Sequence, residues 1–232
     1  MKTTIAIPCI ERHLGNLDNL LSSVVKGTVL PDEVIIAAFP ILKEEQHIII
    51  DRLLDKFKNY FELKIIKETE TKDRQESRNF LIPYLQRSQS DLILWHDADD
   101  TQHPQRIEII KRFFKEQDIV HLCHAYRMGK EKEIGNIDFD TIRCISSEQM
   151  HQCYNEKFLN YDNINWGTFA FGYGFDMPIT AGSCCVKKEV LEKIKFTHEY
   201  PGEDSKFCFD ILKHFKKTIL IDAKIYNYNI VE

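Results

Sequence analysis

The sequence predicts an α/β fold built on a mainly parallel sheet, and two observations carry this prediction. Over residues 1–125, short apolar runs alternate with segments whose apolar residues recur at helical spacing. Such alternation is typical of βαβ units, whose right-handed crossovers place helices on both faces of the sheet. The length of 232 residues, with 43% hydrophobic residues, suits one domain of this kind.

The first half supplies most of the expected elements. Strands are expected at the short apolar runs Thr3–Ile7, Val34–Ala38, Leu63–Ile66, Leu92–Trp95 and Ile119–Cys123. Helices are expected at Leu17–Val25, Ile48–Phe61, Ser77–Leu85 and Pro104–Phe114. Pro8 is expected to end the first strand, because proline cannot donate to a sheet.

The second half breaks the alternation. Residues 127–165 are polar and irregular, which is typical of an insertion lying over a site. Residues 168–176 alternate with period two, which predicts a strand whose phenylalanines are core. Two helices, Lys188–Ile194 and Ser205–Phe215, and two strands, Thr218–Ile221 and Lys224–Tyr228, are then expected. We find no repeat and no linker, so residues 1–232 are expected to form a single domain.

Charge and composition exclude some functions. The formal net charge of −5, without a basic cluster, argues against nucleic acid as a partner. No apolar run approaches the length of a membrane span, so a cytoplasmic protein without an integral membrane segment is expected. The seven cysteines form no CxxC pair, and free thiols in a reducing cytosol are the simplest interpretation. A structural zinc site that uses Cys123 and His124 is an alternative, but it lacks paired ligand spacing.

The strongest chemical signal is Asp97-Ala98-Asp99-Asp100, directly after the strand Leu92–Trp95. Ligands of parallel sheets bind beyond the carboxyl ends of the strands. Carboxylates crowded there repel one another unless a cation binds, and Mg²⁺ or Mn²⁺ prefers such oxygen ligands. The alternative is an acidic turn before a helix N-terminus, and Asp100 and Thr101 fit that description.

Two further segments are charged at expected helix starts. Glu203-Asp204 is ordinarily a cap, but beside a metal site a carboxylate could act as a general base. The segment 74–79 carries Arg74 and Arg78, and a helix N-terminus with two arginines suits a diphosphate. A solvated first turn explains it equally well.

Read together, these segments resemble glycosyltransferase family 2 of the GT-A fold, a Rossmann-like twisted sheet flanked by helices with a smaller acceptor-side region. Six segments match the family's motifs in order and cover nearly the whole chain. They are Ile5–Arg12 ("IPxYNR"), Ser77–Asn79 ("ARN"), Leu92–Asp100 with Pro104 ("DADD…P"), Ala181–Lys188 ("G…vrr"), Glu203-Asp204 ("ED") and Tyr226–Tyr228 ("lyxYr").

The resemblance implies a transfer of sugar from a nucleotide-sugar donor to an acceptor hydroxyl, usually with inversion. It implies that Asp97 and Asp99 hold Mn²⁺ or Mg²⁺ and the donor, with Ala98 between them. Asp204 is implied as the general base, with Glu203 beside it. The resemblance further implies that Pro8 and Glu11 line the nucleotide pocket and that Arg78 approaches the diphosphate.

The two halves of the chain are expected to bind different substrates. Residues 1–125 are expected to bind the donor, and residues 126–232 to bind the acceptor and supply the base. Sugars stack on aromatic faces, so Trp166 is the preferred acceptor candidate, together with Gly182 in the "G…vrr" segment. The acceptor can be a glycan, a glycolipid or a protein, and the oligomeric state stays open.

Two departures from the family pattern bear on the donor and the metal. The second strand ends at Ala37-Ala38-Phe39-Pro40, where the family usually carries an aspartate that reads the nucleobase, so the nucleotide stays open. No histidine follows the last expected strand, so metal binding is expected to rest on Asp99 and the donor.

Two rival functions fit parts of this pattern. A nucleotidyltransferase would need a glycine-rich loop where this chain has Cys9–His13. A degenerate, non-catalytic module that binds nucleotides or glycans is the second alternative, and the intact acidic pairs argue against it.

Overall fold

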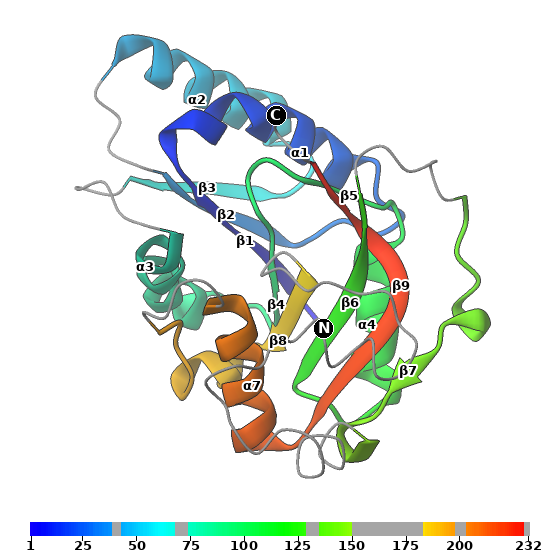
Figure 1. Ribbon diagram of the computed structural model, residues 1–232. Coiled ribbons are helices and arrows are strands. Elements are labelled where there is room, and N and C mark those ends of the chain that lie inside the picture. The colour runs from blue at the N-terminus through cyan, green and yellow to red at the C-terminus, as the bar shows by residue number, and fades with distance from the viewer. Residues whose placement is uncertain (39–42, 68–73, 129–134, 150–182, 198–202, 230–232) are drawn as a thin grey trace.

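The computed structural model describes residues 1–38, 43–67, 74–128, 135–149, 183–197 and 203–229. These residues form one curled, mixed sheet with helices on both faces (Figure 1). The strands are β1 (Thr3–Cys9), β2 (Glu33–Ala38), β3 (Glu62–Lys67), β4 (Leu92–Trp95), β5 (Thr101–Gln102), β6 (His121–Met128), β7 (Cys144–Ile145), β8 (Cys184–Lys187) and β9 (Thr218–Tyr228). The α-helices are α1 (Leu17–Val25), α2 (Glu44–Phe57), α3 (Arg74–Arg87), α4 (Arg106–Glu116) and α7 (Glu203–Phe215).

The sheet has the order β3-β2-β1-β4-β8-β6-β9-β5, and β7 pairs with β9. The pairs β3–β2, β2–β1, β1–β4 and β6–β9 are parallel. Strand β8 runs antiparallel between β4 and β6 and so joins the two parallel parts. The carboxyl ends of β1, β2 and β4 therefore meet at one edge, as the alternating sequence predicts.

Two apolar cores lie on opposite faces of the sheet. One core contains side chains of α1, α2 and α4, and the other contains side chains of α3, α7 and the 3-10 helix η5 (Lys188–Glu192). Helix α1 shows how the pattern works, because Leu17, Leu20, Leu21 and Val24 recur at helical spacing and are all buried. Among the described residues, no helix is long and apolar enough to cross a membrane.

Several expected elements need correction. Strand β1 continues through Pro8 to Cys9. Proline is tolerated there because pairing with β4 ends at Ala6, so Pro8 has no ladder bond to make on that side. The helix expected at residues 48–61 begins and ends four residues earlier, at Glu44 and Phe57, and the helix expected at residues 188–194 is the 3-10 helix η5.

The two strands expected at the C-terminal end are one strand, β9. Its pairing with β6 shifts register between His124 and Tyr126, which explains why the sequence pattern breaks at residues 222–223. Part of the polar segment 127–165 is also ordered, as the 3-10 helix η2 (Phe139–Thr141) and the strand β7 on the sheet. The alternating segment 168–176 lies outside the described residues.

Candidate active site

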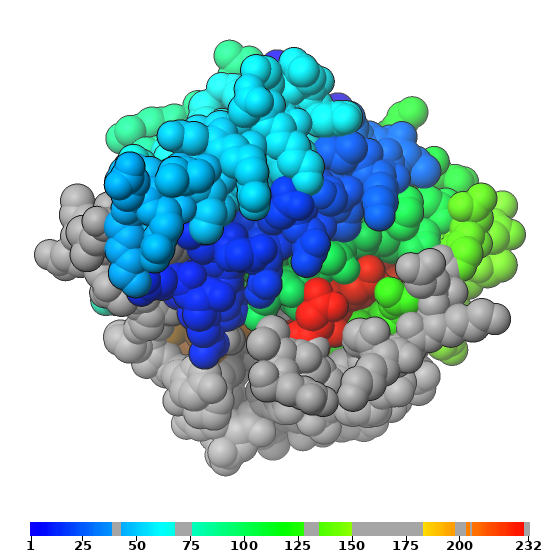
Figure 2. All heavy atoms as spheres, turned by 90° about the horizontal axis from the view of Figure 1, so that it is seen from above, coloured from blue at the N-terminus to red at the C-terminus, as the bar shows by residue number. Residues whose placement is uncertain are grey.

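The acidic turn after β4 is held in place by the end of β9. The Tyr226 hydroxyl accepts a hydrogen bond from the Asp97 backbone N–H (3.0 Å) and donates one to Asp100 Oδ2 (2.8 Å). The Asn229 backbone N–H donates to Asp100 Oδ1 (2.7 Å), and its side chain donates to the Asp99 carbonyl (2.8 Å). In Figure 2, the red atoms at the end of β9 lie beside green atoms from the middle of the chain and below the blue atoms of the N-terminal elements. The turn is therefore fixed by four hydrogen bonds to Tyr226 and Asn229.

Asp100 serves the structure of this turn and does not cap a helix. Helix α4 begins only at Arg106, and Thr101 belongs to β5, so the capping alternative is wrong for both residues. Burial, followed by the negative charge of Asp97, raises the pKa of Asp100 to about 7, although its bonds to Asn229 and Tyr226 act in the opposite direction. Of the three carboxylates in the turn, Asp97 and Asp99 are left for other partners.

A single buried arginine on α3 joins the acidic turn to the start of α7. Arg78 Nη2 lies 3.1 Å from Asp97 Oδ1, and Arg78 Nη1 lies 3.3 Å from Glu203 Oε1 and 3.0 Å from Asp204 Oδ1. Burial would lower the pKa of Arg78, but the charges of Asp204, Asp97 and Glu203 outweigh burial and raise it. Three segments far apart in the sequence thus meet at one guanidinium.

The neighbouring residue of α3 supports this arginine. The Asn79 side chain donates to the Phe196 carbonyl (2.8 Å) and accepts from the Phe196 backbone N–H (3.0 Å). The Phe196 ring stacks on Phe207 of α7 (4.0 Å between centroids) and lies 5.4 Å from the Arg78 guanidinium carbon. Sequence reasoning gave Asn79 no role. The structure shows that it positions the aromatic ring beside Arg78.

A histidine that sequence reasoning did not single out lies against Asp99. His13 belongs to the 3-10 helix η1 (Glu11–Asn16), which follows β1. Its Nδ1 atom lies 3.3 Å from Asp99 Oδ2. The signal that could have found it is position, because the carboxyl ends of β1 and β4 share one edge of the sheet.

Most of the expected donor-side residues line one small cavity of about 40 Å³. It is lined by Pro8, Ile10, His13, Arg78, Asp97, Ala98, Asp99 and Tyr228. A volume of this size suits an ion with its water rather than a sugar. Glu11 does not line this cavity, and its carboxylate accepts a hydrogen bond from Gln46 (2.9 Å) and pairs with Lys43 (3.3 Å) at the start of α2.

The family assignment rests on the sequence as well as on this geometry. The family model described as "Glycosyl transferase family 2" matches residues 4–177. The chain belongs to this family. No curated protein matches the chain.

Solved structures with the same fold are glycosyltransferases of the GT-A type. A crystal structure of S. aureus TarS (residues 1–349) is similar, with a TM-score of 0.67 and 15% identity, over 99% of this chain and 60% of that one. The mannosyltransferase PcManGT from Pyrobaculum calidifontis, solved with GDP-Man and Mn²⁺, has a TM-score of 0.66 and 14% identity, over 100% of this chain and 57% of that one. TarS has also been solved with UDP. The chain thus spans about 60% of the length of these relatives and shares their GT-A fold.

Two expected acceptor-side residues of this family 2 chain cannot be placed. Trp166 and Gly182 lie outside the described residues, as do Phe39 and Pro40, which follow Ala38 in the sequence. Ala37 and Ala38 are buried in β2, so the last described residues of this strand offer no carboxylate.

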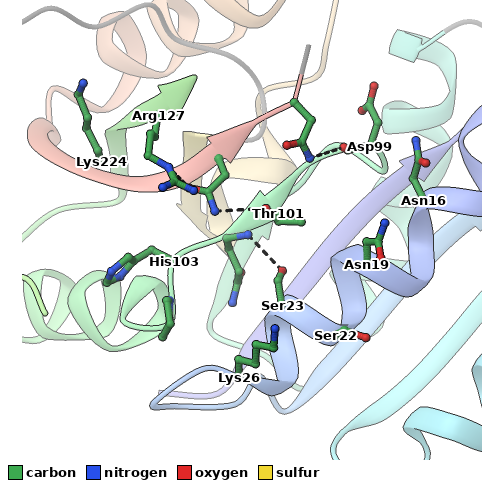
Figure 3. Close-up of a pocket in the computed structure, with 14 residues that line it drawn as sticks. Asn16, Asn19, Ser22, Ser23, Lys26, Asp99, Thr101, His103, Arg127 and Lys224 are labelled. Carbon is green, nitrogen blue, oxygen red and sulfur yellow. Dashed lines mark hydrogen bonds between the residues drawn. The ribbon is translucent and has the colours of Figure 1, made fainter. Parts of the chain in front are cut away.

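A second, larger cleft lies on the other side of Asp99. It measures about 740 Å³ and lies between α1, β5 and the end of β9 (Figure 3). Lys26, Arg127 and Lys224 line it together with several amide and hydroxyl side chains. Such a lining suits a polar or anionic ligand. In this family 2 chain, Asp99 therefore borders two hollows, the small cavity and the large cleft.

Proposed function

We propose that this chain transfers a sugar from a nucleotide-sugar donor to an acceptor hydroxyl, with a divalent metal and with inversion at the anomeric carbon. The observation that carries the proposal is the contact of Arg78 with both Asp97 and the pair Glu203–Asp204. Inverting transfer requires a base on the acceptor side close to the group that holds the donor diphosphate. The guanidinium brings these two groups to one place.

The residues of the acidic turn fit Mn²⁺ or Mg²⁺. Asp97 and Asp99 offer carboxylate oxygens, which such hard cations prefer, beside a cavity of about 40 Å³. Asp97, Glu203 and Asp204 face one guanidinium, which leaves an excess of two negative charges, and Asp99 adds a third. When bound, the metal would offset the negative charge that develops on the leaving diphosphate. His13 would orient Asp99 through their 3.3 Å contact.

The base in this proposal is Asp204, with Glu203 beside it. Asp204 would take the proton of the acceptor hydroxyl while the hydroxyl oxygen forms its bond to the anomeric carbon. The bond from that carbon to the diphosphate oxygen breaks in the same step, and the leaving diphosphate takes the bonding electrons. Arg78 would hold Asp204 in position and place positive charge near the leaving group.

For the donor nucleotide and the acceptor, we propose chemical classes. TarS binds UDP and PcManGT binds GDP-Man, so uridine and guanosine donors are the first to test here. We place the donor in residues 1–125, with Pro8, Glu11 and Ala98 near the nucleotide. We place the acceptor in residues 126–232, with Trp166 and Gly182 beside a glycan, a glycolipid or a protein.

The test is a thermal-shift panel with UDP-, GDP-, CMP- and dTDP-sugars, each with and without Mn²⁺. A ligand at a hundred times its dissociation constant adds about 2.7 kcal/mol of stability, or about 5 to 10 °C for a chain of this size. We expect one nucleotide class to stabilise the wild type in a metal-dependent way. Asp99→Asn should abolish this shift, whereas Asp140→Asn, at an exposed position, should retain it.

Turnover separates the enzyme from a non-catalytic module. Release of free nucleotide from the stabilising donor, lost in Asp204→Asn with donor binding retained, supports the transferase. Metal-dependent binding without any release, to water or to an acceptor mixture, would favour the degenerate binding module. If no nucleotide sugar stabilises the protein, this result would contradict both the transferase and the nucleotide-binding module.

A further inference from the structure

A second cluster of metal-ligating side chains lies in the core, away from the acidic turn. It consists of His121, Cys123, Cys184 and Cys208, all of them buried. We infer that these four residues bind a structural zinc ion as a Cys3His site. This inference does not depend on the proposed transferase activity.

The distances among the four side chains are close to those of a tetrahedral zinc site. His121 Nε2 lies 3.2 Å from Cys123 Sγ and 3.2 Å from Cys184 Sγ. Cys123 Sγ lies 3.7 Å from Cys208 Sγ, and all four ligand atoms lie within 4.8 Å of one another. Zn–S bonds of about 2.3 Å and Zn–N bonds of about 2.0 Å put tetrahedral ligands about 3.5 to 3.8 Å apart. A small outward shift of the imidazole would complete the geometry.

The imidazole contacts favour a metal over a simple hydrogen bond. A neutral ring nitrogen carries either one proton or one lone pair, so it makes one strong hydrogen bond. The Nε2 atom of His121 instead lies at the same distance from the two sulfurs of Cys123 and Cys184. The other ring nitrogen, Nδ1, lies 3.2 Å from the hydroxyl of Thr218, and a hydrogen bond there would fix the orientation of the ring.

The fold explains why these residues meet. His121 and Cys123 are two residues apart on β6 and therefore share one face of the sheet. Cys184 of β8 is the direct cross-strand partner of Cys123, and Cys208 approaches from α7, which packs on that face. His124, the histidine favoured from the sequence, has the opposite parity, and its Nε2 accepts a hydrogen bond from Arg106 instead (3.2 Å). The proposed site therefore shares Cys123 with the alternative considered from the sequence, but it uses His121 where that alternative used His124.

The ligand set also selects the metal. Three thiolates and one imidazole favour zinc, whereas Mn²⁺ and Mg²⁺ prefer the oxygens of Asp97 and Asp99. The two sites are thus chemically distinct. A zinc ion here would tie together β6, β8 and α7, the elements that carry these residues (labelled in Figure 1). Cys208 lies one helical turn after Asp204, so the same ion would fix the start of α7.

The first experiment measures metal in the wild type. The tag-free chain is incubated with zinc, desalted and analysed by mass spectrometry and by zinc-edge X-ray absorption. We expect about one zinc per chain, with about three sulfur neighbours at about 2.3 Å and one nitrogen at about 2.0 Å. Less than about a tenth of an ion per chain, or a shell of oxygen and nitrogen alone, would overturn the inference. A disulfide between Cys123 and Cys208 in the freshly purified protein would do the same.

Matched variants assign the ligands. Cys184→Ala and Cys185→Ala change neighbouring buried cysteines on opposite faces of β8. Zinc should be lost from Cys184→Ala and from Cys208→Ser, and retained in Cys185→Ala and in Asp97→Asn/Asp99→Asn. Equal zinc content in the two alanine variants would refute the ligand assignment. Cobalt in the wild type provides a check that needs no variant, because three thiolates give intense charge-transfer bands in the near ultraviolet and an oxygen site gives none.

Discussion

Replacing Arg78 by methionine tests the central contact of the site. The methionine keeps much of the packing but removes the charge that faces Asp97, Glu203 and Asp204. Removing one partner of a buried ion pair costs about 3 to 5 kcal/mol, because charges are left uncompensated. Arg78 is 3% exposed, whereas the three carboxylates are 11% to 23% exposed, so water can solvate them in part. We therefore expect a loss of about 3 kcal/mol in the free energy of unfolding, at the lower end of that range.

The assay is urea unfolding at pH 8. Arg78→Lys should be intermediate, because lysine keeps the charge but lacks the planar fork that reaches carboxylates on two sides. In a double variant, Glu203→Gln should recover part of the loss, because it removes one stranded charge.

Two results would refute this reasoning. The first is a loss below about 1 kcal/mol for Arg78→Met, the size expected of an exposed ion pair. The second is strict additivity of Arg78→Met and Glu203→Gln, which would mean that the two side chains do not interact.

Three further predictions concern the surroundings of the site. Asn79→Ala removes the hydrogen bonds to the backbone N–H and carbonyl of Phe196 and should lower the free energy of unfolding in urea by about 1 to 3 kcal/mol. A change under about 0.5 kcal/mol would argue against a positioning role of Asn79. Because the pKa of Asp100 is raised to about 7 in the folded chain, its contribution to stability is present below about pH 4 and is lost as the pH rises through 7. Between about pH 4 and pH 7 in metal-free buffer, the free energy of unfolding of the wild type should therefore fall more steeply than that of Asp100→Asn, by up to about 1.4 kcal/mol per pH unit. Equal slopes in the two proteins would contradict the raised pKa of Asp100. Gly27→Ala would bring a Cβ within 2.9 Å of the Val24 carbonyl oxygen. A glycine-to-alanine change raises the melting temperature where the alanine fits without strain, but here the melting temperature should fall relative to the wild type.

The sequence predicted the centre of the sheet well because strands such as β2 and β4 are buried on both faces. Runs such as Leu92–Trp95 and Val34–Ala38 are apolar throughout, which is typical of a parallel sheet. The errors lie where tertiary pairing decides. Pro8 stays in β1 because its neighbour β4 ends early, and β9 stays continuous because a register shift absorbs its irregular residues.

The candidate site was predicted as separate motifs, and their connection could not be predicted. The contacts of Arg78 span 19 residues to Asp97 and 125 residues to Glu203, and no local spacing encodes such distances. The core cluster was missed for a similar reason, because its four residues come from β6, β8 and α7 rather than from one loop. Strand alternation alone, however, would have paired Cys123 with His121 instead of His124.

The charges of the site imply an order of binding. Asp97, Glu203 and Asp204 face one guanidinium, and Asp99 lies in the same acidic turn against His13, so these four carboxylates exceed the charge of Arg78 by three before any ligand arrives. A bare diphosphate would be repelled by these carboxylates, and burial strengthens that repulsion. A divalent cation reduces the excess to one, and Arg78 is then a positive group beside the acidic turn that can face the diphosphate. The donor should therefore bind only with its metal, so metal-free nucleotide sugars should leave the melting temperature unchanged even in the wild type.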